Sequence, residues 1–212
     1  MKRGIFVAFE GGEGSGKSST LAYVAETLRA RGVDVVATRE PGGSPFAEQL
    51  RLAILSGAAA TAHPETLFHL FWLARSDHLA NTIIPALSRG AVVISDRFDG
   101  STYAYQVVAE MRTNLRQLFW RMRAQYVGQF APTRYFNFDI DPLIGLQRAK
   151  RRRDDVTHFD AREIEFHQRV RAGFTEFFEY EEILGSTIDA SQPQDAVRKQ
   201  ITDMMNDLIP AA

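Results

Sequence analysis

Short apolar runs alternate with longer amphipathic segments along the chain. Residues 5–9 form a continuous apolar run that stops at a glycine-rich turn, which is typical of a strand buried on both faces of a parallel sheet. From Leu21 to Leu28 the apolar residues recur at helical spacing, and Gly32 is placed to end that helix. The same two patterns predict further strands at 33–38, 91–95, 134–139 and 187–189, and further helices from 45 onward and at 64–87, 101–108, 115–127, 142–150, about 166–178 and 193–208.

Strands that alternate with helices indicate β-α-β units and a parallel sheet covered by helices on both faces. We therefore expect an α/β fold of three layers, α/β/α, built around a five-stranded parallel sheet. The chain shows no internal repeat, no Ser/Gly-rich linker and no domain break, so we expect residues 1–212 to form a single domain. The polar and charged residues 151–160 interrupt the pattern and are predicted to be an inserted loop.

Composition narrows the classes of protein that remain. The chain has 25 Lys and Arg against 26 Asp and Glu, and this net charge of −1 is not typical of proteins that coat nucleic acid or anionic membranes. The absence of cysteine excludes disulfides, thiolate metal sites and a cysteine nucleophile, and it fits a reducing compartment. No apolar stretch approaches the ~20 residues needed to span a bilayer, and the run at 5–9 is too short for a secretory leader. We expect a cytoplasmic protein that binds neither nucleic acid nor membranes.

Residues 11–18, with the sequence G-G-E-G-S-G-K-S, match the phosphate-binding pattern G-x4-G-K-[ST]. The match follows a predicted strand and opens a predicted helix, which is the context that this loop requires. Its glycines let successive backbone N–H groups point at phosphate oxygens, and the helix N-terminus adds positive potential. In such loops the lysine reaches the β- and γ-phosphates and the hydroxyl faces Mg²⁺. The residues predicted to bind ATP are Gly11, Gly12, Glu13, Gly14, Ser15, Gly16, Lys17, Ser18 and Ser19.

Other features narrow the class of phosphate-binding protein. No N-K-x-D guanine signature occurs, which argues against a GTPase switch, and the chain is short for a helicase or a transporter ATPase. Asp96-Arg97 ends the third predicted strand, and a small phosphate-loop protein with this pair is similar to a nucleotide kinase.

A second group of candidate residues lies on the predicted helix at 64–87. Phe71 and Arg75 are four positions apart and share one helix face with Leu67, Leu70 and Ala74. An arginine on an apolar face needs a partner, because burying its charge unpaired is costly. Two interpretations fit equally well. Either the ring stacks on a nucleobase that the guanidinium hydrogen-bonds, or the ring is core and the guanidinium pairs with an internal carboxylate.

Taken together, the motifs resemble the thymidylate kinase family, from about Gly4 to the C-terminal helix. Taken alone, the R-E-P-G-G segment at 39–43 predicts only an ordinary turn. Its combination with F-x-x-A-R at 71–75 is specific to this family among small kinases. The other matching segments are the phosphate loop with an acid at position 13, D-R-F at 96–98, S-T-Y-A-Y-Q at 101–106, F-D-I-D-P at 138–142 and G-L-Q-R-A at 145–149. The resemblance implies the nucleoside monophosphate kinase fold and the ATP-dependent phosphorylation of dTMP to dTDP with Mg²⁺.

The resemblance also implies roles for individual residues. It places the metal at Ser18 and Asp96, and it places residues 189–192 beside the adenine of ATP. The implied dTMP-binding residues are Glu13 at the 3′-hydroxyl, Arg39 and Arg97 at the phosphate, Phe71 stacked on thymine, Arg75 at thymine O4, Thr102 at N3, Tyr105 against the sugar, and Gln106 in the same loop.

Residues 148–153 hold five cations in six positions and are similar to the lid of the bacterial-type subgroup, which closes over ATP and delivers arginines. Another subgroup carries an arginine in the phosphate loop where this chain has Gly14. The similarity implies a lid insertion at about 150–161 and a catalytic set of Lys17, Arg97, Arg151, Arg152 and Arg153. The chain departs from the usual D-R-x-E-like stretch, since it has T-H-F-D at 157–160. A solvated basic face, a nuclear signal or a nucleic-acid patch is the alternative for this run.

Two other functions remain open from the sequence. A kinase for another deoxynucleoside monophosphate would differ only in its base pocket. A non-catalytic phosphate-loop regulator would need a degraded loop or a missing Asp-Arg pair, and the chain shows neither. Members of the family commonly pair through helices, so a homodimer is expected, with dTMP and ATP as the small-molecule partners.

Overall fold

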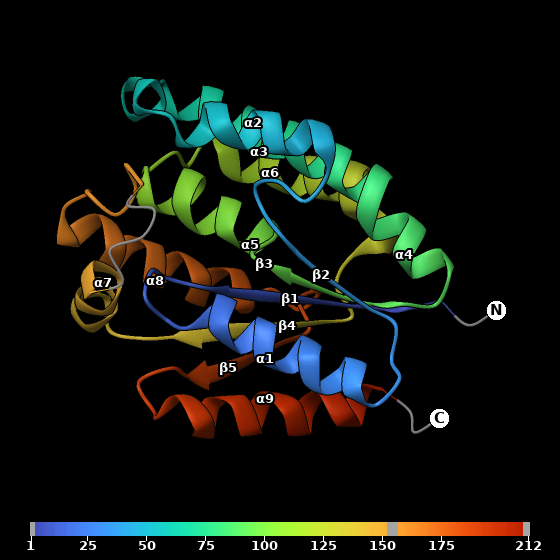
Figure 1. Cartoon of the computed structure of the whole chain (residues 1–212). Helices are drawn as coiled ribbons and strands as arrows, with labels where there is room; N and C mark the ends of the chain where they lie inside the picture. Colours follow the sequence, from blue (N-terminus) through green and yellow to red (C-terminus); the bar gives the residue numbers. More distant parts are fainter. Residues whose placement is uncertain (1–2, 152–156, 210–212) are drawn as a thin grey trace.

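The computed structural model describes residues 3–151 and 157–209. Its centre is one sheet of five parallel strands in the order β2-β3-β1-β4-β5, with helices on both faces (Figure 1). This arrangement confirms the predicted three-layer α/β fold. The strands are β1 (Ile5–Gly11), β2 (Val35–Arg39), β3 (Val92–Asp96), β4 (Arg134–Asp139) and β5 (Gly185–Asp189).

The central strand β1 shows why the sheet needs a helical layer on each face. Phe6 and Ala8 pack into one core and Val7 and Phe9 into the other, because successive side chains of a strand point to opposite faces. The helices α1 (Lys17–Ala30) and α9 (Gln194–Leu208) cover the Val7 side. The Phe6 side is covered mainly by α3 (Pro64–His78), α4 (Ile84–Ser88), α6 (Leu115–Met122) and α8 (Ile164–Phe178).

The other helical elements are α2 (Pro45–Leu55), which packs on α3, and α5 (Asp99–Thr102), α7 (Pro142–Arg151) and the 3₁₀ segments η1 (Gly57–Thr61) and η5 (Gly128–Phe130). Within the described residues no helix has the length and apolar character that crossing a membrane requires.

The ranges 64–87, 101–108 and 115–127 are helical as predicted, but they are not uniform α-helices. Each contains a wider π-helical turn: η2 (Leu79–Ile83), η3 (Tyr103–Ala109) and η4 (Arg123–Val127). Pro85 gives a physical reason for η2, because it is the second residue of α4, just after this turn, and has no N–H to donate to the turn before it.

The strand register brings the candidate residues to one edge of the sheet. Asp96 of β3 lies beside Phe9 of β1 and beside Arg39 of β2. On the other side of β1, Asp139 of β4 is paired with Asp189 of β5. Parallel strands share one carboxyl edge, where ligands bind in open α/β sheets, so the loops after all five strands can contribute to a single site.

A buried carboxylate, Glu10 of β1, ties this edge together. Its Oε1 accepts hydrogen bonds from the backbone N–H groups of Phe98 (2.9 Å) and Ser101 (3.1 Å), and its Oε2 accepts one from the Ser101 hydroxyl (2.5 Å). The side chain is fully buried, and this burial raises its pKa to about 7, against an ordinary 4.5, although the Ser101 hydroxyl offsets part of the effect. The strand that leads into the phosphate loop is therefore held to the turn that follows β3.

The pKa of Glu10 predicts a pH dependence of stability. Because this pKa is raised in the folded state, the folded chain binds the proton more tightly than the unfolded chain, and the resulting stability is lost as the pH rises from 4.5 through about 7. The Glu10→Gln variant lacks this titration. Between about pH 5 and about pH 8, the free energy of unfolding of the wild type should fall relative to the variant by about 2–3 kcal/mol. Urea unfolding at several pH values measures this, and parallel pH profiles for the two proteins would contradict it.

Candidate active site

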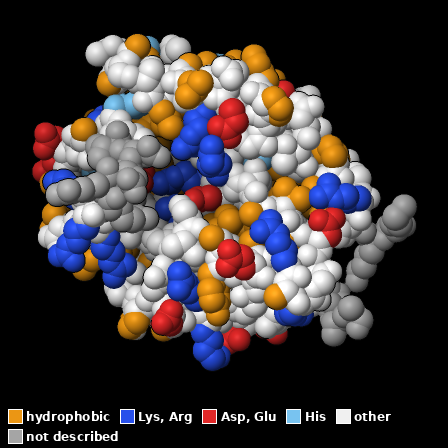
Figure 2. Space-filling view, in the orientation of Figure 1, with side chains coloured by type: hydrophobic (Ala, Val, Ile, Leu, Met, Phe, Trp, Pro, Cys, Tyr) orange, Lys and Arg blue, Asp and Glu red, His pale blue; other side chains and the backbone are white. Residues whose placement is uncertain are grey.

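A cleft of about 870 Å³ opens at the carboxyl edge of the sheet. Its walls come from the phosphate loop, the loop after β2, the end of β3, and residues of α2, α3, η3, α7 and the segment 157–161. Lys and Arg side chains gather around a hollow on the face shown in Figure 2. Motifs that are far apart in the sequence therefore border one cavity of positive character.

The phosphate loop packs closely against the start of α7. Gly14 has φ +67°, and a Cβ added there would lie 1.9 Å from the carbonyl oxygen of Gly145, so only glycine fits. The Ser15 hydroxyl donates to the carbonyl of Gly12 (2.9 Å), and α1 begins at Lys17. Of the predicted ATP-binding residues, 13–18 line the cleft, whereas Gly11, Gly12 and Ser19 lie just outside its lining.

The Lys17 ammonium is buried in its own loop. Its Nζ donates to the carbonyls of Gly11 (2.9 Å) and Gly12 (2.8 Å) and to the Ser15 hydroxyl (3.0 Å). Burial, helped by the nearby charge of Arg97, lowers the pKa of Lys17 to about 8. The carbonyls of Gly11 and Gly12 thus hold the Lys17 ammonium inside the phosphate loop, where phosphate oxygens would bind.

Ser18 and Asp96, the two residues predicted to hold the metal, both line the cleft and contact each other. The Ser18 hydroxyl donates to Oδ2 of Asp96. The other oxygen, Oδ1, is buried and has no hydrogen-bond partner within the described part of the chain. A carboxylate oxygen left without a donor beside a serine hydroxyl suits Mg²⁺, which typically takes one or two protein oxygens together with water and substrate phosphates. No cluster of three or more His, Asp or Glu side chains suited to a metal occurs among residues 3–151 and 157–209.

Glu13, Arg97 and Tyr105 form a hydrogen-bonded group at the centre of the cleft. Arg97 donates to Oε1 of Glu13 (2.7 Å) and to the Gly11 carbonyl (2.9 Å), and its guanidinium lies over the Tyr105 ring. The Tyr105 hydroxyl donates to the same Oε1 (2.8 Å). Burial would raise the pKa of Glu13, but the charges of Arg97 and Lys17 outweigh it and lower the pKa. Glu13 is therefore an ionised acceptor next to the loop.

Two further arginines reach the cleft, and only one of them was predicted. Arg39 pairs with Glu48 (3.1 Å), and Arg51 donates to the carbonyl of Pro41 (2.8 Å). Arg51 was missed, although the signal used for Arg75 was present: it shares a helix face with the buried residues Ala47 and Ile54. Three guanidinium groups, those of Arg39, Arg51 and Arg97, thus line one cavity.

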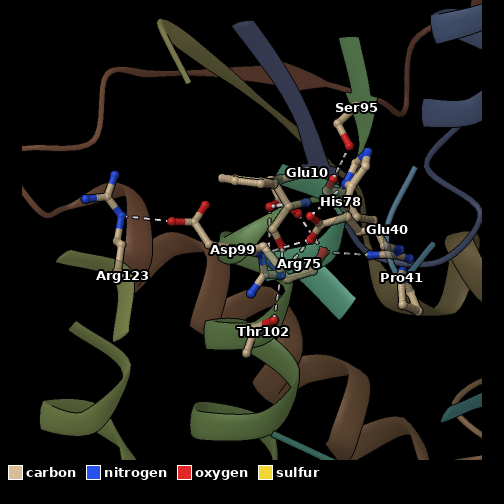
Figure 3. Close-up of polar contacts among 12 residues, drawn as sticks. Glu10, Glu40, Pro41, Arg75, His78, Ser95, Asp99, Thr102 and Arg123 are labelled. Carbon is tan, nitrogen blue, oxygen red and sulfur yellow. Dashed lines mark hydrogen bonds and ion pairs between the residues drawn. The ribbon is translucent and has the colours of Figure 1, made fainter. Parts of the chain in front are cut away.

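The structure clarifies the two interpretations of Phe71 and Arg75. Phe71 lines the cleft, whereas Arg75 is buried just beneath it, with Nε donating to Oε2 of Glu40 (2.9 Å) (Figure 3). Its Nη2 donates to the Phe98 carbonyl (3.0 Å) and to the Thr102 hydroxyl (2.9 Å). The expected internal carboxylate therefore exists. Nη1 of Arg75 is nevertheless buried without a partner in residues 3–151 and 157–209, so a donor remains for a ligand.

The remaining predicted residues divide between the cleft wall and the end of α7. Gln106 lines the cleft beside Tyr105, and Thr102 lies beneath the wall with Arg75. Arg151 is exposed at the end of α7 and does not line the cleft, and Arg152 and Arg153 lie outside the described residues. In the T-H-F-D stretch at 157–160, His158 does not line the cleft, and its Nε2 contacts the Ile54 carbonyl (3.0 Å).

Comparison with known proteins agrees with this geometry. The family model described as thymidylate kinase matches residues 9–201. A protein of Ruegeria pomeroyi named thymidylate kinase is 44% identical over 202 residues, which cover 95% of this chain and 94% of that protein. A protein of Caulobacter vibrioides with the same name is 40% identical over 205 residues, which cover 97% of each chain. On the evidence of its motifs, its cleft and these matches, the chain belongs to the thymidylate kinase family.

Proposed function

We propose that the chain transfers the γ-phosphoryl group of ATP to dTMP and releases dTDP and ADP. The observation that carries this is that the phosphate loop and Phe71 line the same cleft, together with Arg39, Arg51 and Arg97, while the buried Arg75 on the same helix keeps Nη1 unpartnered within the described residues. In the reaction a phosphate oxygen of dTMP forms the new bond to the γ-phosphorus, and the bond from that phosphorus to the β–γ bridging oxygen breaks. Such transfer depends on alignment and on positive charge rather than on a covalent protein intermediate.

The ATP side of the cleft is built from the phosphate loop. Lys17 would exchange the carbonyls of Gly11 and Gly12 for phosphate oxygens, which are the stronger acceptors. Ser18 and Oδ1 of Asp96 are the groups that would hold Mg²⁺, which supplies positive charge at the β- and γ-phosphates when bound.

The dTMP side of the cleft is built from α2, α3 and η3. Phe71 would stack on the thymine ring, and the unpartnered Nη1 of Arg75 would donate to O4. Glu13 would accept the 3′-hydroxyl, and the ring of Tyr105 would leave no room for a 2′-hydroxyl. The residues that complete this set are Thr102 and Gln106 beside the base, and Arg39, Arg51 and Arg97 around the phosphate.

The acceptor choice predicts the outcome of a substrate panel. With ATP and Mg²⁺, the chain should turn over dTMP with a higher kcat/KM than dCMP, dGMP or AMP, because each of these three lacks either the 4-keto pyrimidine that suits Arg75 or the deoxyribose that suits Tyr105. A coupled assay of ADP release measures this. Faster turnover of any other acceptor would refute the dTMP assignment, and the absence of any acceptor-dependent ATP consumption would favour a non-catalytic regulator over a kinase.

We also propose that the basic segment 148–153 forms part of a lid at about 150–161 that supplies charge to the transferred group. Replacing Arg151, Arg152 and Arg153 together by Ala should lower kcat by about a hundredfold or more and change the KM for dTMP little, since arginines of this kind act mainly on the transition state. The matched control is Arg121→Ala on α6, which removes an exposed cation away from the cleft. A triple variant with unchanged kcat would remove the lid arginines from the mechanism.

A homodimer and a cytoplasmic location complete the proposal. Phe46 and Leu52 of α2 and Leu73 of α3 are each more than half exposed on two helices that pack side by side, and such apolar surface favours a partner. The absence of cysteine fits the reducing cytoplasm.

The dimer proposal has its own test. A charge buried in an apolar interface is costly, so Leu73→Glu should shift a dimer toward monomer in sedimentation velocity. Leu184→Glu is the matched control, since Leu184 has the same exposed fraction, 57%, and precedes β5. A wild type that sediments as a monomer at all concentrations would contradict the proposal.

A further inference from the structure

A histidine with no role in the chemistry described above lies fully buried on α3, the helix that carries Phe71 and Arg75. His78 is the last residue of α3, one helical turn after Arg75, and none of its surface is exposed. A fully buried imidazole needs partners for both ring nitrogens, because an unsatisfied buried polar atom is destabilising. It is not among the residues that line the cleft.

Both ring nitrogens of His78 have hydrogen-bond partners. Nδ1 lies 3.1 Å from Oε1 of Glu40, and Nε2 lies 2.8 Å from the Thr38 hydroxyl. A carboxylate beside an arginine only accepts hydrogen bonds, so Nδ1 carries the proton and donates it to Glu40. Nε2 shares its hydrogen bond with the Thr38 hydroxyl.

Glu40 is the shared partner of His78 and Arg75. Its Oε1 takes the imidazole N–H, and its Oε2 takes Nε of Arg75, so each oxygen has one dedicated donor residue (Figure 3). The Arg75 guanidinium also lies over the rings of Trp72 (4.7 Å) and Phe98 (5.2 Å). A carboxylate held on both oxygens cannot rotate, and this fixes the plane of the guanidinium that it binds.

The loop after β2 is shaped around this histidine. A Cβ added at Gly43 would lie 2.4 Å from Nε2 of His78 and 2.5 Å from the Thr38 hydroxyl, so the chain passes directly over the ring. The Thr82 hydroxyl holds the Gly43 carbonyl from the other side (2.7 Å). The R-E-P-G-G segment therefore closes over His78 and supplies Glu40 to it.

We propose that His78 and Glu40 are positioning residues that set base specificity by holding the Arg75 guanidinium in one plane. In this plane Nε and Nη2 are committed to protein acceptors, and Nη1 is left for position 4 of the base. A guanidinium only donates, so it favours the 4-keto oxygen of thymine over the 4-amino group of cytosine. The inference deepens the proposed function and rests on Arg75 reading the base.

The test compares dTMP with dCMP as acceptors, through the ratio of their kcat/KM values. His78→Leu should lower this ratio about tenfold or more, because loosening a charged hydrogen-bond partner costs roughly that factor. The KM for ATP should stay unchanged. His78→Asn, whose amide can still donate to Glu40, should restore much of the ratio. Thr38→Val keeps the shape of Thr38 and removes only its hydroxyl, so it should give a smaller loss in a protein that still folds.

Two further variants complete the test: one controls for general destabilisation, and the other tests whether Arg75 reads the base. Leu79→Ala leaves a cavity in the core next to His78 and removes none of the hydrogen bonds to Glu40. It should therefore lower the melting temperature and leave the dTMP to dCMP ratio of kcat/KM unchanged. Arg75→Gln should abolish the discrimination. If Arg75→Gln abolishes it but His78→Leu and Thr38→Val do not change it, the positioning role is refuted and the base-reading role stands. If Arg75→Gln also leaves the ratio unchanged, the base-reading role is refuted, and the inference with it.

Discussion

The site depends first on the buried carboxylate of Glu10. It stands on the central strand, directly before the phosphate loop, and its oxygens hold the backbone of Phe98 and Ser101. Arg97 precedes this turn and Thr102 and Tyr105 follow it, so one side chain ties the phosphate loop to the residues proposed for dTMP. Burial makes the charged form of Glu10 less favourable and so raises its pKa, which is the energetic cost of holding these contacts inside the fold.

Two other buried carboxylates follow the same logic. Glu40 holds Arg75 and His78, and Asp99 accepts from Nε of Arg123 (2.8 Å) and from the Tyr135 hydroxyl (2.7 Å). A buried pair adds little net stability, but removing one partner leaves an uncompensated charge and costs about 3–5 kcal/mol. These pairs therefore fix geometry more than they add stability. Charged groups held in place before the substrate arrives need little reorganisation during phosphoryl transfer.

The fold and the phosphate loop could be predicted from the sequence, because the strand pattern and the loop motif are local signals. The three-layer fold and the family are confirmed. The partner of Arg75 could not be identified, because Glu40 is 35 residues away and meets it only through the fold. The π-helical turns depend on tertiary packing that a 3.6-residue period does not reveal. The residue roles, including those of Arg152 and Arg153, stay predictions.

The most direct test of the account is the distance from Nη1 of Arg75 to O4 of thymine in a crystal structure of the chain with dTMP bound. A preorganised pocket predicts ~3 Å for this distance, with Nε of Arg75 still donating to Glu40 and Phe71 stacked on the ring. A base bound away from Nη1, or a guanidinium that has left Glu40 to reach it, would contradict the claim that buried carboxylates set the site before the substrate arrives.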